Sequence, residues 1–64
     1  MSNIWTKRYH ATVKDGRKYR AVSYHSTHRK GTQGNQQDMA AAYKRLYKEP
    51  LTQAARVIKI TTMS

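Results

Sequence analysis

Two runs with alternating side chains flank the dipeptide Asp15-Gly16, and this arrangement constrains the fold more than any other feature of the chain. In residues 5–14, WTKRYHATVK, large or apolar side chains fall mainly on alternate positions, which is typical of a strand with one buried face. Residues 17–25, RKYRAVSYH, are rich in Tyr and Val and predict a second strand. Asp-Gly is a favoured hairpin dipeptide of type I′, so the two runs are predicted to form an antiparallel β-hairpin.

The register of this hairpin decides which side chains are buried. A two-residue turn at Asp15-Gly16, which we favour, places Tyr9 opposite Val22. A three-residue loop with a glycine bulge would shift the pairing by one residue and bury Tyr19 and Ala21 instead. In the favoured register the core face holds Trp5, Tyr9, Ala11, Val13, Val22 and Tyr24, and the outer face holds Arg8, His10, Lys14, Arg17, Tyr19 and His25.

A loop and a helix are predicted after the hairpin. Residues 26–36 include two glycines and no aliphatic side chain, which is typical of a flexible or functional loop. An amphipathic helix is predicted from Gln36 to Glu49, with Asn35 as its N-cap and Pro50 ending it. The apolar stripe of this helix would consist of Met39, Ala42, Tyr43 and Leu46.

The end of the chain predicts a third strand. Residues 57–62, VIKITT, are mostly β-branched, and strict alternation would put Ile58 and Ile60 on one face. In an alternative interpretation, residues 51–59 form a second helix and complete a helix-turn-helix. We favour the strand, which gives a single domain over residues 1–64. Its fold would be of the α+β class: a ββαβ order, with a three-stranded, mainly antiparallel sheet and one helix packed on one face.

The charge of the chain indicates its kind of partner. Thirteen Lys and Arg residues face three Asp and Glu residues, so the formal net charge is +10. Such a field attracts polyanions, and nucleic acid is the predicted partner, with DNA favoured over RNA. An acidic protein surface is the second hypothesis. A membrane partner is not expected, because no segment pairs a strong apolar face with a basic one. An open edge strand leaves room for a homodimer.

Catalysis is not expected. Each of the three carboxylates has a local role, in a turn, near a helix start or beside a proline, and they form no pair suited to acid–base chemistry. The spacing His25-x-x-His28 offers two metal ligands without a cysteine or a nearby carboxylate, so neither a metal nor a cofactor is predicted. The chain lacks cysteine and any long apolar stretch, which fits a cytoplasmic protein.

The candidate nucleic-acid-binding residues are basic side chains on the hairpin, the following loop and the helix. Arg can hold a phosphate or the edge of guanine through two hydrogen bonds, and a two-stranded ribbon fits the major groove. Tyr19 could stack on an unpaired base instead. The candidate residues are Arg8, His10, Lys14, Arg17, Lys18, Arg20, Arg29, Lys30, Lys44, Arg45 and Lys48.

Two resemblances to known families extend this hypothesis. The segments YHATVKDGRKYR and DMAAAYKRLY resemble the small DNA-binding domains of plant ethylene-response factors and phage integrase arms, which place a three-stranded sheet in the major groove with a helix behind it. In the present chain the third strand follows the helix rather than preceding it, so no base-reading residue is carried over from those families.

The second resemblance covers most of the chain. The segment YHATV, the hairpin, the Ala-rich helix and the closing RVIKITT resemble the small early proteins of short-tailed lytic phages that inhibit host RNA polymerase. The resemblance implies a phage protein that acts in regulation or host takeover in the bacterial cytoplasm. It also implies a protein interface at Arg56 and Lys59, which would contact an acidic surface of the host enzyme.

Overall fold

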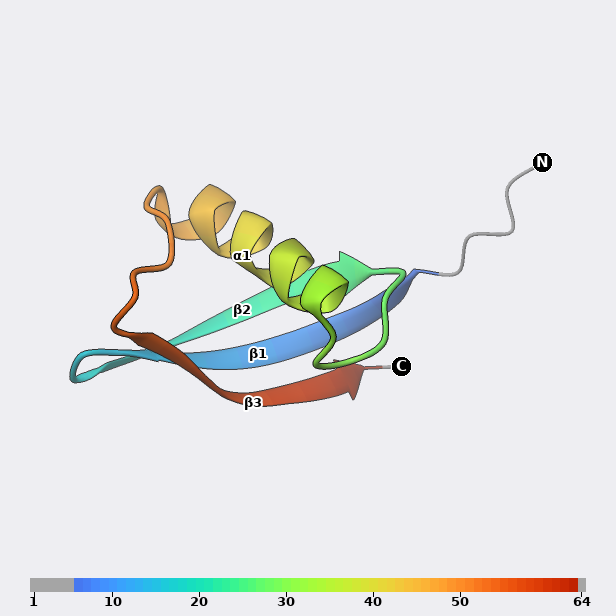
Figure 1. Cartoon of the computed structure of the whole chain (residues 1–64), viewed down its shortest axis with the longest axis horizontal. Coiled ribbons are helices and arrows are strands. Elements are labelled where there is room, and N and C mark those ends of the chain that lie inside the picture. Colours follow the sequence, from blue (N-terminus) through green and yellow to red (C-terminus); the bar gives the residue numbers. More distant parts are fainter. Residues whose placement is uncertain (1–5, 64) are drawn as a thin grey trace.

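The computed structural model describes residues 6–63 and has the predicted α+β fold, with the order β1β2α1β3. In the sheet, β1 is the central strand and pairs antiparallel with β2 on one side and β3 on the other, and the helix lies on one side of the sheet (Figure 1). The alternative helix-turn-helix is wrong, because the last element is a strand paired with β1. The elements are β1 (Lys7–Asp15), β2 (Lys18–Ser26), α1 (Gln33–Tyr47) and β3 (Ala55–Met63).

The β1–β2 hairpin turns at Gly16-Arg17 and not at Asp15-Gly16. Tyr9 therefore pairs with Tyr24, and the predicted pairing of Tyr9 with Val22 is wrong by two residues. Gly16 has a φ of 66° and Arg17 has no positive φ. Glycine at the first central position is the pattern of a type II′ turn, whereas type I′ needs a positive φ at both central residues.

The predicted faces of the hairpin are confirmed for the residues that lie in β1 and β2, because a shift of two residues returns a side chain to the same side of a strand. The prediction that Arg17 lies on the outer face is wrong, because Arg17 is in the turn. The alternative register is excluded, since Tyr19 is 64% exposed on the face away from the helix. Trp5, which was predicted on the core face, lies outside the described residues. The buried side chains of the strands are Tyr9, Ala11, Val13, Val22, Tyr24 and Ser26.

The helix begins three residues before its predicted start. Thr32 is the N-cap, and its Oγ1 accepts a hydrogen bond from the backbone N–H of Asn35 at 3.4 Å. The predicted cap, Asn35, is instead fully buried, and its Oδ1 accepts a hydrogen bond from the Tyr24 hydroxyl at 2.5 Å. A buried side-chain amide needs a hydrogen-bond partner. Asn35 therefore bonds to Tyr24 in the core and does not cap the helix.

The helix ends at Tyr47, two residues earlier than predicted. Lys48 adopts the left-handed conformation with a φ of 63°, and its N–H donates to the carbonyl of Lys44 at 2.8 Å. This bond closes the last turn in the way that C-terminal caps commonly do. Pro50 disfavours helical backbone at Glu49, so the chain must turn here.

The helix packs on β2, and β3 joins the fold by pairing with β1 (Figure 1). Met39 and Tyr43 are buried, and Tyr47, one turn further on, packs against the core. The predicted place of Leu46 on the apolar stripe is wrong, because its side chain is 57% exposed. The helix thus covers only part of the sheet. No helix in the described range 6–63 is long and apolar enough to cross a membrane.

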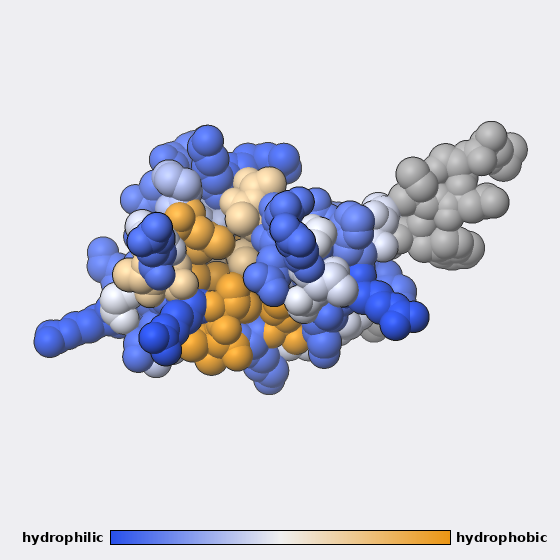
Figure 2. Space-filling model, in the orientation of Figure 1, coloured by the Kyte–Doolittle hydropathy of each residue, from blue (hydrophilic) through white to orange (hydrophobic). Residues whose placement is uncertain are grey.

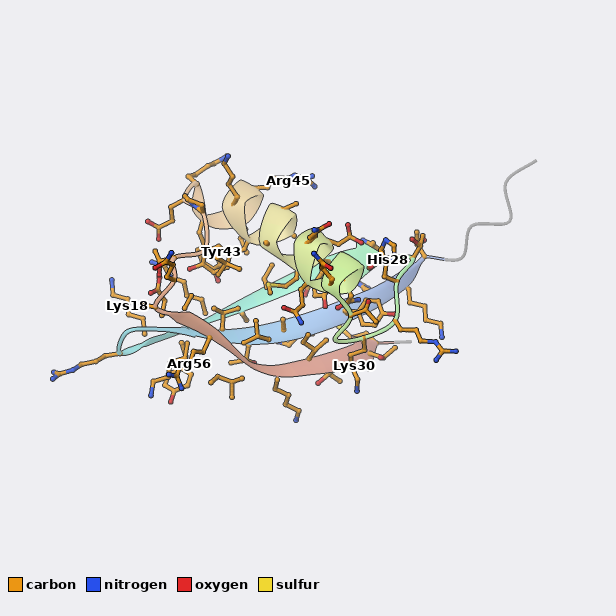
Figure 3. All side chains as sticks on the ribbon, in the orientation of Figure 1. Lys18, His28, Lys30, Tyr43, Arg45 and Arg56 are labelled. Carbon is orange, nitrogen blue, oxygen red and sulfur yellow. The ribbon has the colours of Figure 1, made fainter. Side chains whose placement is uncertain are left out.

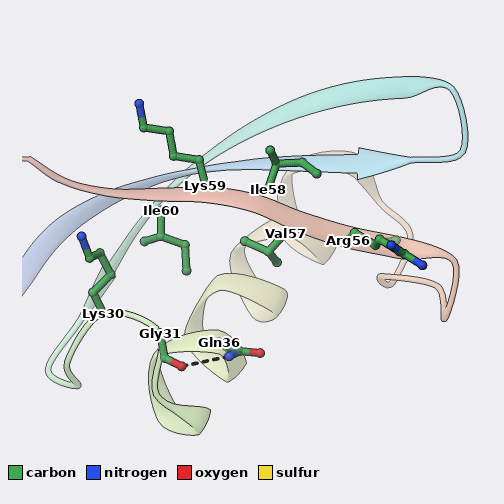
Figure 4. A pocket seen from close by; sticks show the side chains of 9 residues that line it. Lys30, Gly31, Gln36, Arg56, Val57, Ile58, Lys59 and Ile60 are labelled. Carbon is green, nitrogen blue, oxygen red and sulfur yellow. Dashed lines mark hydrogen bonds between the residues drawn. The ribbon is translucent and has the colours of Figure 1, made fainter.

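The side chains of β3 do not alternate strictly between the two faces of the sheet, because the pairing of β1 with β3 contains an irregularity between Thr12 and Val13. Val57 and Ile60 pair with core-face residues of β1, while Ile58 is the extra residue of the bulge. The prediction that Ile58 and Ile60 share a face is therefore wrong: Figure 4 shows their side chains on opposite sides of the strand.

Candidate nucleic-acid interface

The sheet face turned away from α1, which we call the outer face, is built from alternate residues of all three strands. Because side chains alternate along a strand and cross-strand partners share a face, the register defines its members. Strand β1 contributes Arg8, His10, Thr12 and Lys14. Their partners are His25, Ser23, Ala21 and Tyr19 in β2, and Met63, Thr61, Lys59 and Arg56 in β3.

The outer face gathers cations from both β1 and β3. Arg56 is the cross-strand partner of Lys14, and Lys59 is the partner of Thr12. Sequence reasoning assigned Arg56 and Lys59 to a protein interface and missed their place beside Lys14. Only the β1–β3 register brings them together, since β2, α1 and three connections separate these strands along the chain. With Arg8, the face carries four permanent positive charges.

The three Asp and Glu side chains, all within the described residues, do not lie on the outer face. Asp15 is on the helix side of β1 and accepts a hydrogen bond from the Thr52 hydroxyl at 3.3 Å. Asp38 accepts one from the Ser26 hydroxyl at 2.6 Å. Glu49 forms an ion pair with Arg20. Since these three are all the Asp and Glu residues of the chain, no acidic side chain compensates the positive charge of the outer face.

The centre of the outer face carries small polar side chains. His10 and Ser23 are cross-strand partners, and their Nδ1 and Oγ atoms are 3.3 Å apart. Near the turn, Tyr19 is largely exposed, and the Nζ of Lys14 lies 5.5 Å from the centroid of its ring. An aromatic ring and polar groups are thus available to a ligand between the cations.

Arg20, a predicted nucleic-acid ligand, lies on the helix side of the sheet. Its guanidinium pairs with Glu49, donates to the Tyr43 hydroxyl at 2.9 Å and sits 4.7 Å from the centroid of the Tyr47 ring. The carboxylate of Glu49, followed by the hydroxyl of Tyr43, raises the pKa of Arg20. The Tyr47 hydroxyl in turn donates to the carbonyl of Ala21 at 2.6 Å. These contacts join the end of α1 to β2.

The loop predicted at residues 26–36 is shorter in the structure, since β2 extends to Ser26 and α1 starts at Gln33. Its backbone is held at His28, whose carbonyl accepts hydrogen bonds from the Tyr9 hydroxyl at 3.1 Å and the Asn35 side chain at 3.2 Å. The N–H of His28 donates to Ser26 Oγ at 3.0 Å. These bonds fix the position from which Arg29 and Lys30 project.

The remaining predicted ligands are distributed over other parts of the molecule. Arg17 is in the turn, and Lys18 is on the helix side of β2. Lys44, Arg45 and Lys48 are exposed near the end of α1, where Figure 3 shows Arg45. The structure therefore brings only Arg8, His10 and Lys14 of the predicted set onto the outer face.

A groove with an apolar floor separates β3 from the start of α1, because the helix does not cover β3 (Figure 4). Val57 and Ile60 face into this groove, and Lys30 and Gln36 lie along it. Gln36 is held there by a hydrogen bond from its Nε2 to the carbonyl of Gly31 at 2.9 Å. Figure 2 shows hydrophobic atoms exposed between hydrophilic margins on this side of the molecule.

Metal ligation finds no support in the described part of the chain, where no three His, Asp or Glu side chains come together. His25 lies on the outer face, while the ring of His28 contacts the position of Gly34 in α1. The fold and the outer face define a small α+β domain with a basic sheet surface that carries no Asp or Glu side chain within the described residues. No family model, curated protein or solved structure matches this chain.

Proposed function

We propose that the protein binds nucleic acid, double-stranded DNA in the first place, with the outer face of its sheet. The observation that carries this proposal is the separation of charge: four cations from two strands share the outer face, and the Asp and Glu side chains all lie elsewhere in the described residues. A surface of this kind exchanges condensed counterions on DNA for protein cations, which is a general source of affinity for nucleic acid.

The dimensions of the sheet suit a duplex groove. Three strands span two inter-strand distances, or about 10 Å, and nine extended residues of β1 cover about 30 Å. The major groove of B-DNA is about 12 Å wide, which accommodates such a face. In this arrangement Arg8, Lys14, Arg56 and Lys59 reach phosphates, while His10, Ser23 and Tyr19 face the base edges.

The proposed activity is binding without chemistry, with regulation through occupancy of the DNA. The test is a salt-stepped binding series on duplex DNA, single-stranded DNA and RNA of equal length. Duplex DNA is expected to bind most tightly, with affinity that falls steeply as salt is raised. If single-stranded DNA or RNA binds more tightly than the duplex, the preference for double-stranded DNA is wrong, and Tyr19 would stack on unpaired bases. Absence of binding to all three at low salt would reject it.

The groove between β3 and α1 favours a second candidate function, the docking of an acidic protein segment with apolar side chains. Val57 and Ile60 would receive the apolar groups, and Lys30 would pair with an acidic one. An acidic surface of a host enzyme such as RNA polymerase is the partner that the second resemblance implies.

Adjacent residues of β3 allow a matched test of this candidate. In a nuclease-treated bacterial lysate, a stoichiometric protein partner should be lost with Val57→Asp, whose side chain faces the groove. It should be retained with Ile58→Asp, whose side chain faces the other way (Figure 4). If nuclease treatment removes all captured material, or if both variants behave alike, docking in the groove is rejected.

A further inference from the structure

We propose that the edge of β2 carries a site for one unpaired nucleotide that adjoins a duplex bound on the outer face. This inference rests on the proposed function and names a further part of the nucleic acid that the protein recognises. Strand β2 is the edge strand opposite to β3, and α1 packs on it. Side chains of the helix and of the outer face therefore line common hollows at this edge.

Two adjoining hollows form the site, with volumes of about 450 and 240 Å³, and their walls share Ser23, Ala42 and Arg45. The first hollow also includes His10 and Leu46, and the second also includes His25 and Asp38. The members that come from the outer face are His10, Ser23 and His25. The hollows thus continue the proposed nucleic-acid surface around the edge of β2 to the helix.

The first hollow is suited to a nucleic-acid base. Unpaired bases stack on aromatic rings and on the guanidinium plane of arginine, and His10 and Arg45 offer these groups. Ala42 and Leu46 add apolar contacts, and the Leu46 side chain is 57% exposed. The Oγ of Ser23, which lies 3.3 Å from Nδ1 of His10, can donate to a base edge or accept from it.

The second hollow is suited to the sugar and phosphate of the same nucleotide. Arg45 can hold a phosphate through two hydrogen bonds, and His25 lies in the same hollow. Asp38 also lines this hollow, but in the described range 6–63 it forms no ion pair with Arg45. A carboxylate repels a phosphate and accepts a hydrogen bond from a hydroxyl. The phosphate is therefore expected beside Arg45, and a sugar hydroxyl beside Asp38.

Arg45 and Leu46 also have explanations that require no ligand. A basic residue in the last turn complements the helix dipole, and single apolar side chains are common on protein surfaces. Neither explanation predicts that these two residues change the affinity for an unpaired nucleotide. Such a change is therefore the readout that separates the proposed site from a structural role.

The test compares a blunt DNA duplex with the same duplex carrying one unpaired nucleotide at a 3′ end, which leaves its sugar hydroxyl free for Asp38. Fluorescence anisotropy should show that the overhanging duplex binds at least about fivefold more tightly, the lower end of the contribution of one stacked base. The hollow variant, Arg45→Gln, Leu46→Ala, should bind both duplexes equally. Both replaced side chains are exposed, so the variant is expected to fold.

The matched control is Lys44→Gln, which removes one positive charge from the same helical turn but lines neither hollow. It should keep the preference for the overhanging duplex. Loss of the preference in this control as well would overturn the inference, because the preference would then follow net charge. Loss of the preference in Tyr19→Ala, with retention in the hollow variant, would also overturn it and place the unpaired base at Tyr19.

The wild-type protein separates the inference from the proposed function. Equal affinity for the blunt and overhanging duplexes would overturn the inference and leave the proposed function standing. Absence of binding to both duplexes would reject both. Titration of the protein alone with AMP tests a free nucleotide as the occupant. Tight binding of AMP that is lost in the hollow variant would assign the site to a free nucleotide and overturn the inference.

Discussion

Replacing Gly34 with alanine should destabilise the protein, although alanine is normally the better helix former. A Cβ atom on Gly34 would lie 2.6 Å from Cγ and 2.7 Å from Cδ2 of the His28 ring. Carbon atoms pack best at about 3.5–4.0 Å, so the ring must move. The backbone of His28 is held in place, since its carbonyl accepts bonds from Tyr9 and Asn35 and its N–H donates to Ser26, so only rotation of the ring about its side-chain bonds can relieve the contact.

The size of the effect follows from two opposing contributions. Alanine in place of glycine stabilises a helix interior by up to about 1 kcal/mol. Overpacking a filled site costs about 1–3 kcal/mol. The net expectation for Gly34→Ala is a loss of about 1 kcal/mol, which for a domain of this size lowers Tm by about 4–8 °C. Thermal unfolding followed by circular dichroism measures this shift.

A double-mutant cycle isolates the contact between Gly34 and His28. The variant His28→Ala removes the ring but keeps the backbone hydrogen bonds, so Gly34→Ala added to it should raise Tm. The change of sign is the signature of the steric contact. If Gly34→Ala raises Tm equally in wild type and in His28→Ala, the His28 ring does not contact position 34. The proposed steric contact between the loop and the start of α1 would then be wrong.

The remaining predictions concern the core and its hydrogen bonds. Tyr24→Phe leaves Oδ1 of the buried Asn35 without its donor and should cost about 1–3 kcal/mol in urea unfolding, whereas a cost near zero would contradict the bond. Burial raises the pKa of Tyr24, so its contribution to stability is complete below the ordinary tyrosine pKa of about 10 and declines as pH rises above it. The alkaline decline of stability should therefore be smaller in Tyr24→Phe than in wild type, and equal declines would contradict this. Met39→Ala should cost about 2–5 kcal/mol, while Leu46→Ala should change stability by less than about 0.5 kcal/mol, and similar losses would contradict the observed placement of the helix.

Local patterns in the sequence were sufficient to predict the element order and the two faces of the hairpin. Alternation has a period of two, so even an error of two residues in the pairing left Tyr9, Val22 and Tyr24 on the buried face. The turn itself was misplaced because Asp15-Gly16 satisfies the type I′ preference, while the chain uses Gly16 at the first position of the turn.

The features that were missed depend on contacts between distant segments. The local sequence around Asn35 predicts a helix cap, but the side chain is buried and accepts a hydrogen bond from the Tyr24 hydroxyl. The local sequence around Arg20 predicts a cation available to a ligand, but Arg20 forms an ion pair with Glu49. Arg56 and Lys59 join the outer face only through the pairing of β3 with β1, which no local pattern specifies.

The salt dependence of duplex binding tests the central claim, that the outer face holds nucleic acid, most directly. If each of the four outer-face cations Arg8, Lys14, Arg56 and Lys59 neutralises one phosphate, the slope of log K against log salt is about −3.6. Affinity would then fall about 150-fold between about 50 and 200 mM salt. The variant Arg56→Gln, Lys59→Gln is expected to reduce the slope to about −1.8. A slope that is unchanged in the Arg56 and Lys59 variant would contradict the claim.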